Sequence, residues 1–177
     1  PPFSPQEGRW TVMDAALSSA GCGALAELGF FDDALGAGQS FTLASGAEDG
    51  GFTLAGGATF PGADEPEPLS CDLLANRRDF VCEPRELELP LDAAAIAEFA
   101  PEDGPLRELL DNLPDGATVT FVLDVEVDGT FETRTAGSTT TALTVDCEGL
   151  LCGGLALVGV ELPCTITADT LLEHDGG

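Results

Sequence analysis

The chain has 177 residues, and its 32 Asp and Glu against six Arg and no Lys give a formal net charge of −26. Hydrophobic residues nevertheless form 44% of the sequence, which excludes a disordered acidic tail and predicts one globular domain. The scarcity of cations excludes nucleic acid and anionic membrane surfaces as partners, because both are bound through patches of Lys and Arg.

The excess of acid also bears on habitat. With 32 carboxylates and six Arg, at least 26 carboxylates have no cation of their own and are expected in water, where they repel one another. This repulsion weakens as the Debye length falls to about 3–5 Å in sea water or brine. The composition therefore favours a halophilic or marine adaptation, with drift in a genome biased towards Ala, Gly and Arg as the alternative.

The predicted domain covers residues 8–174 and follows a Pro-containing leader or linker at 1–7. Its first strand is expected at Arg9–Ala16, where alternate residues from Trp10 to Asp14 fall on one face. Asp14 is the one carboxylate that this alternation directs towards an apolar face. A cap on the following turn is the preferred interpretation of Asp14, ahead of a catalytic carboxylate.

Residues 15–36 are expected to form a helical insert, because they are rich in Ala and space their Leu and Phe at three or four positions. Gly21, Gly23 and Gly29 interrupt the spacing, so short helical turns are expected in place of one long helix.

Two copies of the sequence FTLA, at Phe41–Ala44 and Phe52–Ala55, alternate apolar and small polar residues on either side of an acidic, Gly-rich loop. This pattern predicts a β-hairpin. The following stretch, 56–69, is rich in Pro and acid and is expected to be an exposed loop. Weak calcium binding by these acidic loops is kept as an alternative role for them.

Six Cys in a chain of this size predict disulfides and an oxidising compartment, extracellular, periplasmic or at the cell surface. A hairpin that turns at Asn76-Arg77 places Cys71 opposite Cys82. Cys147 and Cys152 enclose a short loop, which leaves Cys22 to pair with Cys164. A zinc site is the weaker alternative, because the chain has no C-x-x-C pair and no His near these Cys.

The sequence RELELPL at 85–91 predicts a half-buried strand, and a second helical insert follows at 92–113. Asp92 is expected to cap its first helix, and Pro105 to begin its second. Leucines at helical spacing on the second helix, Leu109 among them, are expected to pack against the sheet or over its mouth.

Apolar residues alternate most clearly over 117–147. A three-residue loop at Asp128–Thr130 is predicted, which would pair Val127 with Phe131 and Asp124 with Arg134. Further strands are expected at Thr139–Cys147 and Pro163–Thr170. The chain thus predicts a mainly β fold, an antiparallel barrel of about nine strands with two helical inserts and disulfide bonds, and a strongly curved sheet or sandwich as the alternative.

No pattern of catalytic residues is present in the sequence. His174 is the only His and lies in a C-terminal segment that is expected to be mobile. The sequence DVEVDG at 124–129 begins like a calcium loop but has Thr135 where such a loop needs Glu. No glycine-rich phosphate loop occurs. The chain is therefore expected to be neither an enzyme nor a metal or cofactor protein.

The inner face of the C-terminal hairpins carries the functional prediction. On the expected register, Thr residues point inward beside apolar ones, and a solid core seldom takes so many Thr. Apolar walls with a few hydroxyls are typical of a ligand pocket, although a position near the barrel rim or a register shifted by one residue would also explain the pattern. The expected ligand-binding residues are Phe121, Leu123, Thr133, Thr135, Thr141, Leu143 and Val145, with Leu109 from the covering helix.

Gly8-Arg9-Trp10, at the entry to the first strand, resembles the G-x-W motif of the lipocalins. In that family the Trp packs across the closed end of an eight-stranded calycin barrel that carries small hydrophobic molecules. The resemblance implies an internal hydrophobic pocket here, with Trp10 in a structural role. The helical inserts depart from the family pattern.

Together these observations predict a secreted or surface-tethered protein that holds a small hydrophobic, lipid-like molecule inside a β-barrel. The alternative is a non-catalytic structural or adhesive module with a solid core, which acts through its loops.

Overall fold

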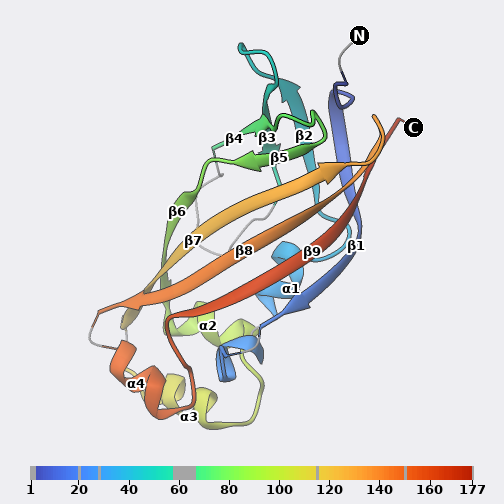
Figure 1. The fold of residues 1–177 in the computed structure, drawn as a ribbon. Helices are drawn as coiled ribbons and strands as arrows, with labels where there is room; N and C mark the ends of the chain where they lie inside the picture. Colours follow the sequence, from blue (N-terminus) through green and yellow to red (C-terminus); the bar gives the residue numbers. More distant parts are fainter. Residues whose placement is uncertain are drawn as a thin grey trace.

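The fold is built on nine antiparallel strands, seen in a computed structural model that describes residues 3–19, 21–27, 29–57, 67–114, 116–149 and 151–176. The strands are β1 (Gly8–Ser18), β2 (Ser40–Ser45), β3 (Gly51–Gly56), β4 (Leu69–Leu73), β5 (Asp79–Cys82), β6 (Arg85–Asp92), β7 (Thr118–Phe131), β8 (Ala136–Glu148) and β9 (Cys164–His174). Their order in the sheet is β5-β4-β3-β2-β1-β9-β8-β7-β6, and β5 also pairs with β7. This second pairing closes eight strands into a barrel and leaves β6 as an extra strand, which confirms the predicted closed barrel (Figure 1).

Alternation of apolar and polar residues builds the wall formed by β7, β8 and β9. Leu123 pairs with Val145, and Leu143 pairs with Ile166, so that the inner face is a continuous layer of buried aliphatic side chains. β9 extends past its predicted end and carries its inward residues at even positions, including Thr170.

The turn between β7 and β8 lies further along the chain than the sequence predicts. The predicted loop at Asp128–Thr130 is wrong, because β7 continues through it to Phe131 and the chain turns at 132–135. Asp124 accordingly pairs with Thr144, and its predicted pairing with Arg134 is wrong as well.

The contacts of Gly129 explain why Asp128-Gly129, a sequence typical of turns, lies inside β7. A Cβ atom at Gly129 would lie 2.6 Å from Cζ of Phe80 and 2.4 Å from the carbonyl oxygen of Ser138. The glycine therefore allows the ring of Phe80 to pack directly on the backbone of β7, which is a requirement of packing and not of chain reversal.

The two hairpins predicted from local patterns are confirmed. In the hairpin β2–β3, Leu43 pairs with Leu54, so the two FTLA copies face each other. In the hairpin β4–β5, Cys71 pairs with Cys82 as predicted. Residues 58–66, most of the predicted exposed loop, lie outside the described residues.

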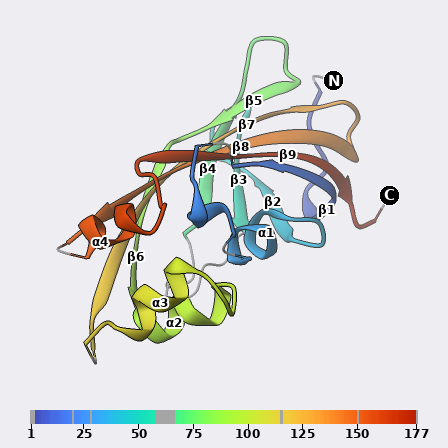
Figure 2. The same cartoon turned by 90° about the horizontal axis from the view of Figure 1, so that it is seen from below.

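The described residues contain five short helical segments, of which four fall within the predicted inserts and one is an addition. They are a 3-10 turn at Ala24–Glu27, α1 (Phe30–Leu35), α2 (Ala93–Phe99), α3 (Pro105–Asp111) and α4 (Cys152–Leu157). The insert predicted at 15–36 begins too early, because β1 continues to Ser18. The carboxylate of Asp92 accepts a hydrogen bond of 2.7 Å from the backbone N–H of Ala95, and Pro105 begins α3, both as predicted. α4 was not predicted, because Gly153 and Gly154 make that segment a poor helix by propensity. α2, α3 and α4 lie at one end of the barrel, and α1 lies nearer its middle (Figure 1); Figure 2 shows the helices from below.

All three predicted disulfides are confirmed: Cys22–Cys164, Cys71–Cys82 and Cys147–Cys152. Three intramolecular disulfides fit an oxidising compartment. Within the described ranges, no helix is both long enough and apolar enough to cross a bilayer.

Two groups of buried residues fill the interior. At one end of the barrel, Trp10, Phe52, Phe80 and Phe131 form an aromatic cluster whose rings lie 4.9–5.7 Å apart between centroids. We call this region the closed end. At the other end, aliphatic residues of β6–β9 pack against α1–α4.

The segment before β1 is fixed to the closed end. Pro5 is buried, and the carbonyl oxygen of Gln6 accepts a hydrogen bond of 2.9 Å from the indole N–H of Trp10. His174 was expected in a mobile tail, but it is the last residue of β9 and pairs with Trp10. Its ring Nε2 lies 2.9 Å from the carbonyl oxygen of Glu7, which ties the two ends of the described chain together.

One edge of β7 pairs with two different strands along its length. β5 pairs with residues 128–130 of this edge, and β6 pairs with residues 118–125. The ladder between β4 and β5 ends at the Cys71–Cys82 pair. Beyond it, one edge of β6 has no strand partner among the described residues, so no ladder joins β4 to β6. We call this break between the described parts of β4 and β6 the gap.

Candidate functional site

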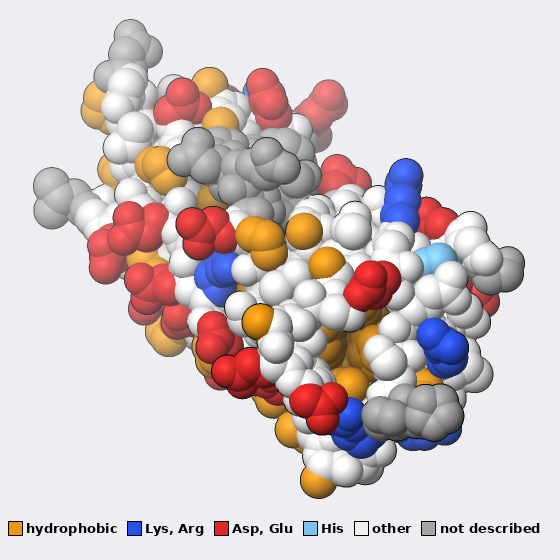
Figure 3. Space-filling view, turned by 90° about the horizontal axis from the view of Figure 1, so that it is seen from above, with side chains coloured by type: hydrophobic (Ala, Val, Ile, Leu, Met, Phe, Trp, Pro, Cys, Tyr) orange, Lys and Arg blue, Asp and Glu red, His pale blue; other side chains and the backbone are white. Residues whose placement is uncertain are grey.

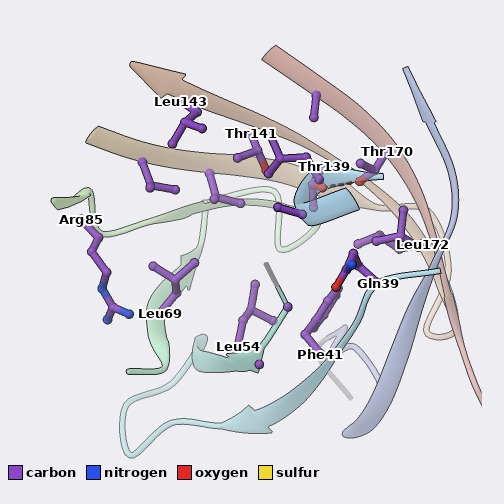
Figure 4. Close-up of a pocket in the computed structure, with 18 of the residues that line it drawn as sticks. Gln39, Phe41, Leu54, Leu69, Arg85, Thr139, Thr141, Leu143, Thr170 and Leu172 are labelled. Atoms are coloured by element: carbon purple, nitrogen blue, oxygen red, sulfur yellow. Dashed lines mark hydrogen bonds between the residues drawn. The ribbon is translucent and has the colours of Figure 1, made fainter. Parts of the chain in front are cut away.

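A cavity of about 150 Å³ lies inside the barrel, between the closed end and the helix-covered end. Almost every strand and α1 contribute to its wall (Figure 4). The lining residues are Val12, Ala34, Leu35, Gln39, Phe41, Leu54, Gly56, Gly57, Glu67, Leu69, Arg85, Leu87, Val125, Val127, Thr139, Thr141, Leu143, Ala168, Thr170 and Leu172.

The wall is apolar over most of its area, with hydroxyls on one side. Thr139 of β8 and Thr170 of β9 face each other across the ladder, and their Oγ1 atoms are hydrogen bonded at 2.6 Å (Figure 4). Thr170 is the one polar residue among the fully buried ones of the described chain. A Thr pair holds two hydroxyl hydrogens and uses one between its own oxygens, so it offers a further donor.

Gln39 and Arg85 are the other long polar side chains of the wall. The amide nitrogen of Gln39 donates to the carbonyl oxygen of Asp33, which holds the segment before β2 against α1. The guanidinium of Arg85 donates to the carbonyl oxygens of Glu67 and Pro68. Arg85 stands on the side of the cavity opposite Thr139 and Thr170 (Figure 4).

The gap between β4 and β6 lies beside the cavity. Leu69 begins β4, Arg85 begins β6, and both belong to the wall of the cavity although no ladder joins them. The cavity therefore borders the gap, and Arg85 and Glu67 stand at its rim.

The structure brings two of the predicted ligand-binding residues, Thr141 and Leu143, to the cavity. Phe121, Leu123 and Val145 point inward as predicted, but they are buried in the aliphatic group under the helices and are not part of the cavity wall.

The remaining predicted residues lie elsewhere. Thr133 and Thr135 were expected on the inner wall, but both stand in the β7–β8 turn, where Thr133 is exposed and Thr135 half-buried. Their expected inward direction is wrong, because it followed from the misplaced turn. Leu109 of α3 lines a separate void of about 30 Å³ among α2, α3, α4 and β6, so α1 takes the place beside the cavity that was predicted for α3.

Several cavity residues were missed at the sequence level, chiefly Gln39, Arg85 and Thr170. Thr170 is the last residue of the predicted strand Pro163–Thr170, and the alternation of apolar residues in that strand could have predicted that Thr170 points inward. Arg85 shares the alternation of Leu87 and Leu89, so it too could have been placed on the inner face of its strand. Gln39 lies outside any periodic segment and left no signal.

On the face shown in Figure 3, acidic side chains outnumber those of Arg. Within the described residues, no three acidic, His or Cys side chains gather in a way that would hold a metal ion. Asp14 is exposed at an irregularity of β1 and accepts from the backbone N–H of Ala15. In the acidic loop between β2 and β3, Asp49 is paired with Arg77 at 2.9 Å.

Two carboxylates have pKa values below their usual range. Hydrogen bonding and the charge of Arg77 lower the pKa of Asp49. Hydrogen bonds from Thr130 and Asn76 lower the pKa of Asp79. Both groups hold loops near the closed end, and neither lines the cavity.

Comparisons with known proteins give no further guide: no family model, no curated protein and no solved structure matches the chain.

Proposed function

We propose that this protein binds a small hydrophobic molecule inside its barrel. The observation that carries the proposal is the cavity of about 150 Å³ with mainly aliphatic walls and a few polar groups. Ligand sites in proteins are typically of this kind, concave and apolar, with a small number of polar side chains that orient the ligand.

The size of the cavity limits the ligand. A cavity of about 150 Å³ is large enough for a molecule about the size of benzene. In this proposal, one end of a longer molecule reaches the solvent beside Arg85, where no ladder joins the described parts of β4 and β6. The proposed ligand therefore has a compact or single-chain apolar body.

The resemblance of Gly8-Arg9-Trp10 to the lipocalin motif supports the same proposal. Trp10 is fully buried and packs against Phe131, in keeping with a structural role at the closed end of a ligand-carrying barrel. The disulfides support a location outside the reducing cytosol: extracellular, periplasmic or at the cell surface.

In this proposal the protein binds and does not catalyse. The ligand-binding residues are those of the cavity wall, with Thr141 and Leu143 common to the sequence prediction and the structure. The acidic surface keeps nucleic acid and anionic membranes from being partners, and it suits a marine or halophilic medium.

Titration calorimetry with methyl octanoate, an uncharged ester with a single apolar chain, tests the proposal. Binding of one ester per protein is expected. Thr141→Phe fills the cavity and should abolish the binding. Thr144→Phe is the matched control, because it makes the same change on the same strand at an outward position. It should leave the affinity unchanged.

Two results would overturn the proposal. One is no binding of the ester by a folded wild-type protein. The other is equal binding by the wild type and by a folded Thr141→Phe variant, which would place the ester outside the cavity. Either result would favour the structural or adhesive module that acts through its loops.

A further inference from the structure

Arg85 is a cation on the inward face of β6, the extra strand that pairs with β7 beside the closed barrel. In β6 it follows the alternation of Leu87 and Leu89, while Glu86 and Glu88 between them are exposed. Its neighbour across the ladder is Val125, which also lines the cavity. Among the described lining residues, Arg85 is the only one with a positive charge.

Among the described residues, no carboxylate side chain pairs with the charge of Arg85. Three other Arg make ion pairs: Arg9 with Asp175, Arg77 with Asp49, and Arg107 with Asp111. No carboxylate of the described chain lies within ion-pair distance of Arg85, although the protein has 32 Asp and Glu. Glu67 stands at the same rim, but it contacts Arg85 through its backbone carbonyl, and its side chain is exposed.

The guanidinium is held in place and still has free donors. A guanidinium has five N–H groups, and Arg85 gives two of them to the carbonyl oxygens of Glu67 and Pro68. These bonds fix the group at the rim of the gap. The planar fork of the remaining donors matches the two oxygens of a carboxylate, which Arg binds more specifically than any other side chain does.

We propose, on the basis of the proposed function, that the ligand is a monocarboxylate. Its head group binds Arg85 at the rim between β4 and β6. Its apolar body extends into the cavity towards Leu54, Val127 and Leu172. The carboxylates of the outer surface oppose this binding only weakly, because at physiological salt their fields are screened beyond about 8 Å.

The test compares octanoate with methyl octanoate, which differ in the head group and share the chain. Titration calorimetry of the wild-type protein should show octanoate to bind roughly tenfold more tightly than the ester, as expected for a charge-assisted hydrogen bond pair. This preference should decrease between about 0.1 M and 1 M NaCl, because salt screens the ion pair.

Three variants assign the preference to Arg85. Arg85→Gln should bind both molecules with the affinity that the ester has for the wild type. Arg85→Lys should retain part of the preference, because it keeps the charge and loses the fork. Arg134→Gln, in the exposed β7–β8 turn, removes the same charge far from the cavity wall and should change neither affinity.

The outcomes separate this inference from the proposed function. If the wild type binds the ester but shows no preference for octanoate, the inference is overturned and the proposed function stands. A preference that persists in folded Arg85→Gln overturns the assignment of Arg85. If neither molecule binds, both proposals fail. Should Arg85→Gln not fold, Arg85→Lys and the salt dependence of the wild type still decide the matter.

Discussion

The closed end and the cavity are two parts of one barrel interior that differ in the size of their side chains. At the closed end, strands present Trp10, Phe52, Phe80 and Phe131, whose rings contact one another and leave all four buried. In the middle of the barrel, the wall consists mainly of Leu, Val, Thr and Ala, with Phe41 as its one aromatic residue among those described, and a space of about 150 Å³ remains.

This difference shows that the closure of the wall alone does not decide whether a small barrel is solid or hollow. The interior of an eight-stranded barrel is just wide enough for side chains to fill, so filling depends on their volume at each level. Phe131 and Leu143 both point inward from neighbouring strands. The first belongs to the packed level and the second to the wall of the cavity.

The largest expected loss of stability follows from removing the disulfide at either end of the barrel. Cys22–Cys164 closes a separation of 142 residues and joins the helix-covered end to β9, while Cys71–Cys82, near the closed end, closes only 11. In the chain-entropy model their removal by paired Cys→Ala substitutions costs about 5 and about 3 kcal/mol, respectively. Urea denaturation of each double variant measures both values. A greater cost for Cys71–Cys82 would show the closed end to depend more on its covalent bond than on its aromatic contacts.

The next largest effect is the difference in unfolding free energy between a Phe→Ala substitution at the closed end and one in the cavity wall. Phe131→Ala removes a ring that contacts three other aromatic rings in a fully packed site, and should lower the free energy of unfolding by about 3–5 kcal/mol. Phe41 lies in the wall of the cavity and is half-buried, so Phe41→Ala should cost less than half as much. Urea denaturation compares the two variants, and equal losses would contradict a hollow middle level.

The smallest effect concerns the pH dependence of the closed end. The pKa of Asp79 is lowered chiefly by the hydroxyl of Thr130, so the folded state holds its proton less tightly than the unfolded chain does. The resulting stabilisation is present above the unfolded pKa of about 3.9 and is lost as the pH falls through the lowered folded value. Thr130→Val should therefore lower Tm relative to the wild type at pH 6 by more than at about pH 2.5.

The control for this measurement is Thr144→Val. Among the described residues, the hydroxyl of Thr144 is hydrogen bonded to that of Thr165 and not to a carboxylate, so the difference between this variant and the wild type should not depend on pH. If the Tm difference between Thr130→Val and the wild type were also independent of pH, Asp79 would not contribute to the pH dependence of stability.

The sequence predicted the strands, the helix starts at Asp92 and Pro105, and the Cys pairs, because these depend on alternation, caps and spacing within short segments. It failed at Asp128-Gly129, where a local turn signal competes with long-range pairing. β5 and β8 both pair with residues 128–130, and Phe80 occupies the space over Gly129. Neither neighbour is visible from the segment itself.

Only part of the cavity wall was predicted, because its position also depends on contacts between distant strands. Alternation tells which residues point inward, and it placed Thr141 and Leu143 correctly. The level of a residue along the barrel depends on how the strands are shifted against one another and on which aromatic rings occupy the closed end. Val145 is only two residues beyond Leu143 on the same face, yet it is packed under the helices.

The disulfide Cys71–Cys82 is the last cross-strand pair of the ladder between β4 and β5. The backbone N–H of Glu83 donates to the carbonyl oxygen of Ser70 next to this disulfide. One covalent bond and one hydrogen bond thus secure β4 to β5 at the point where their ladder ends. Reduction of the disulfide would leave hydrogen bonds and side-chain packing alone to hold the two strands together beside the buried ring of Phe80.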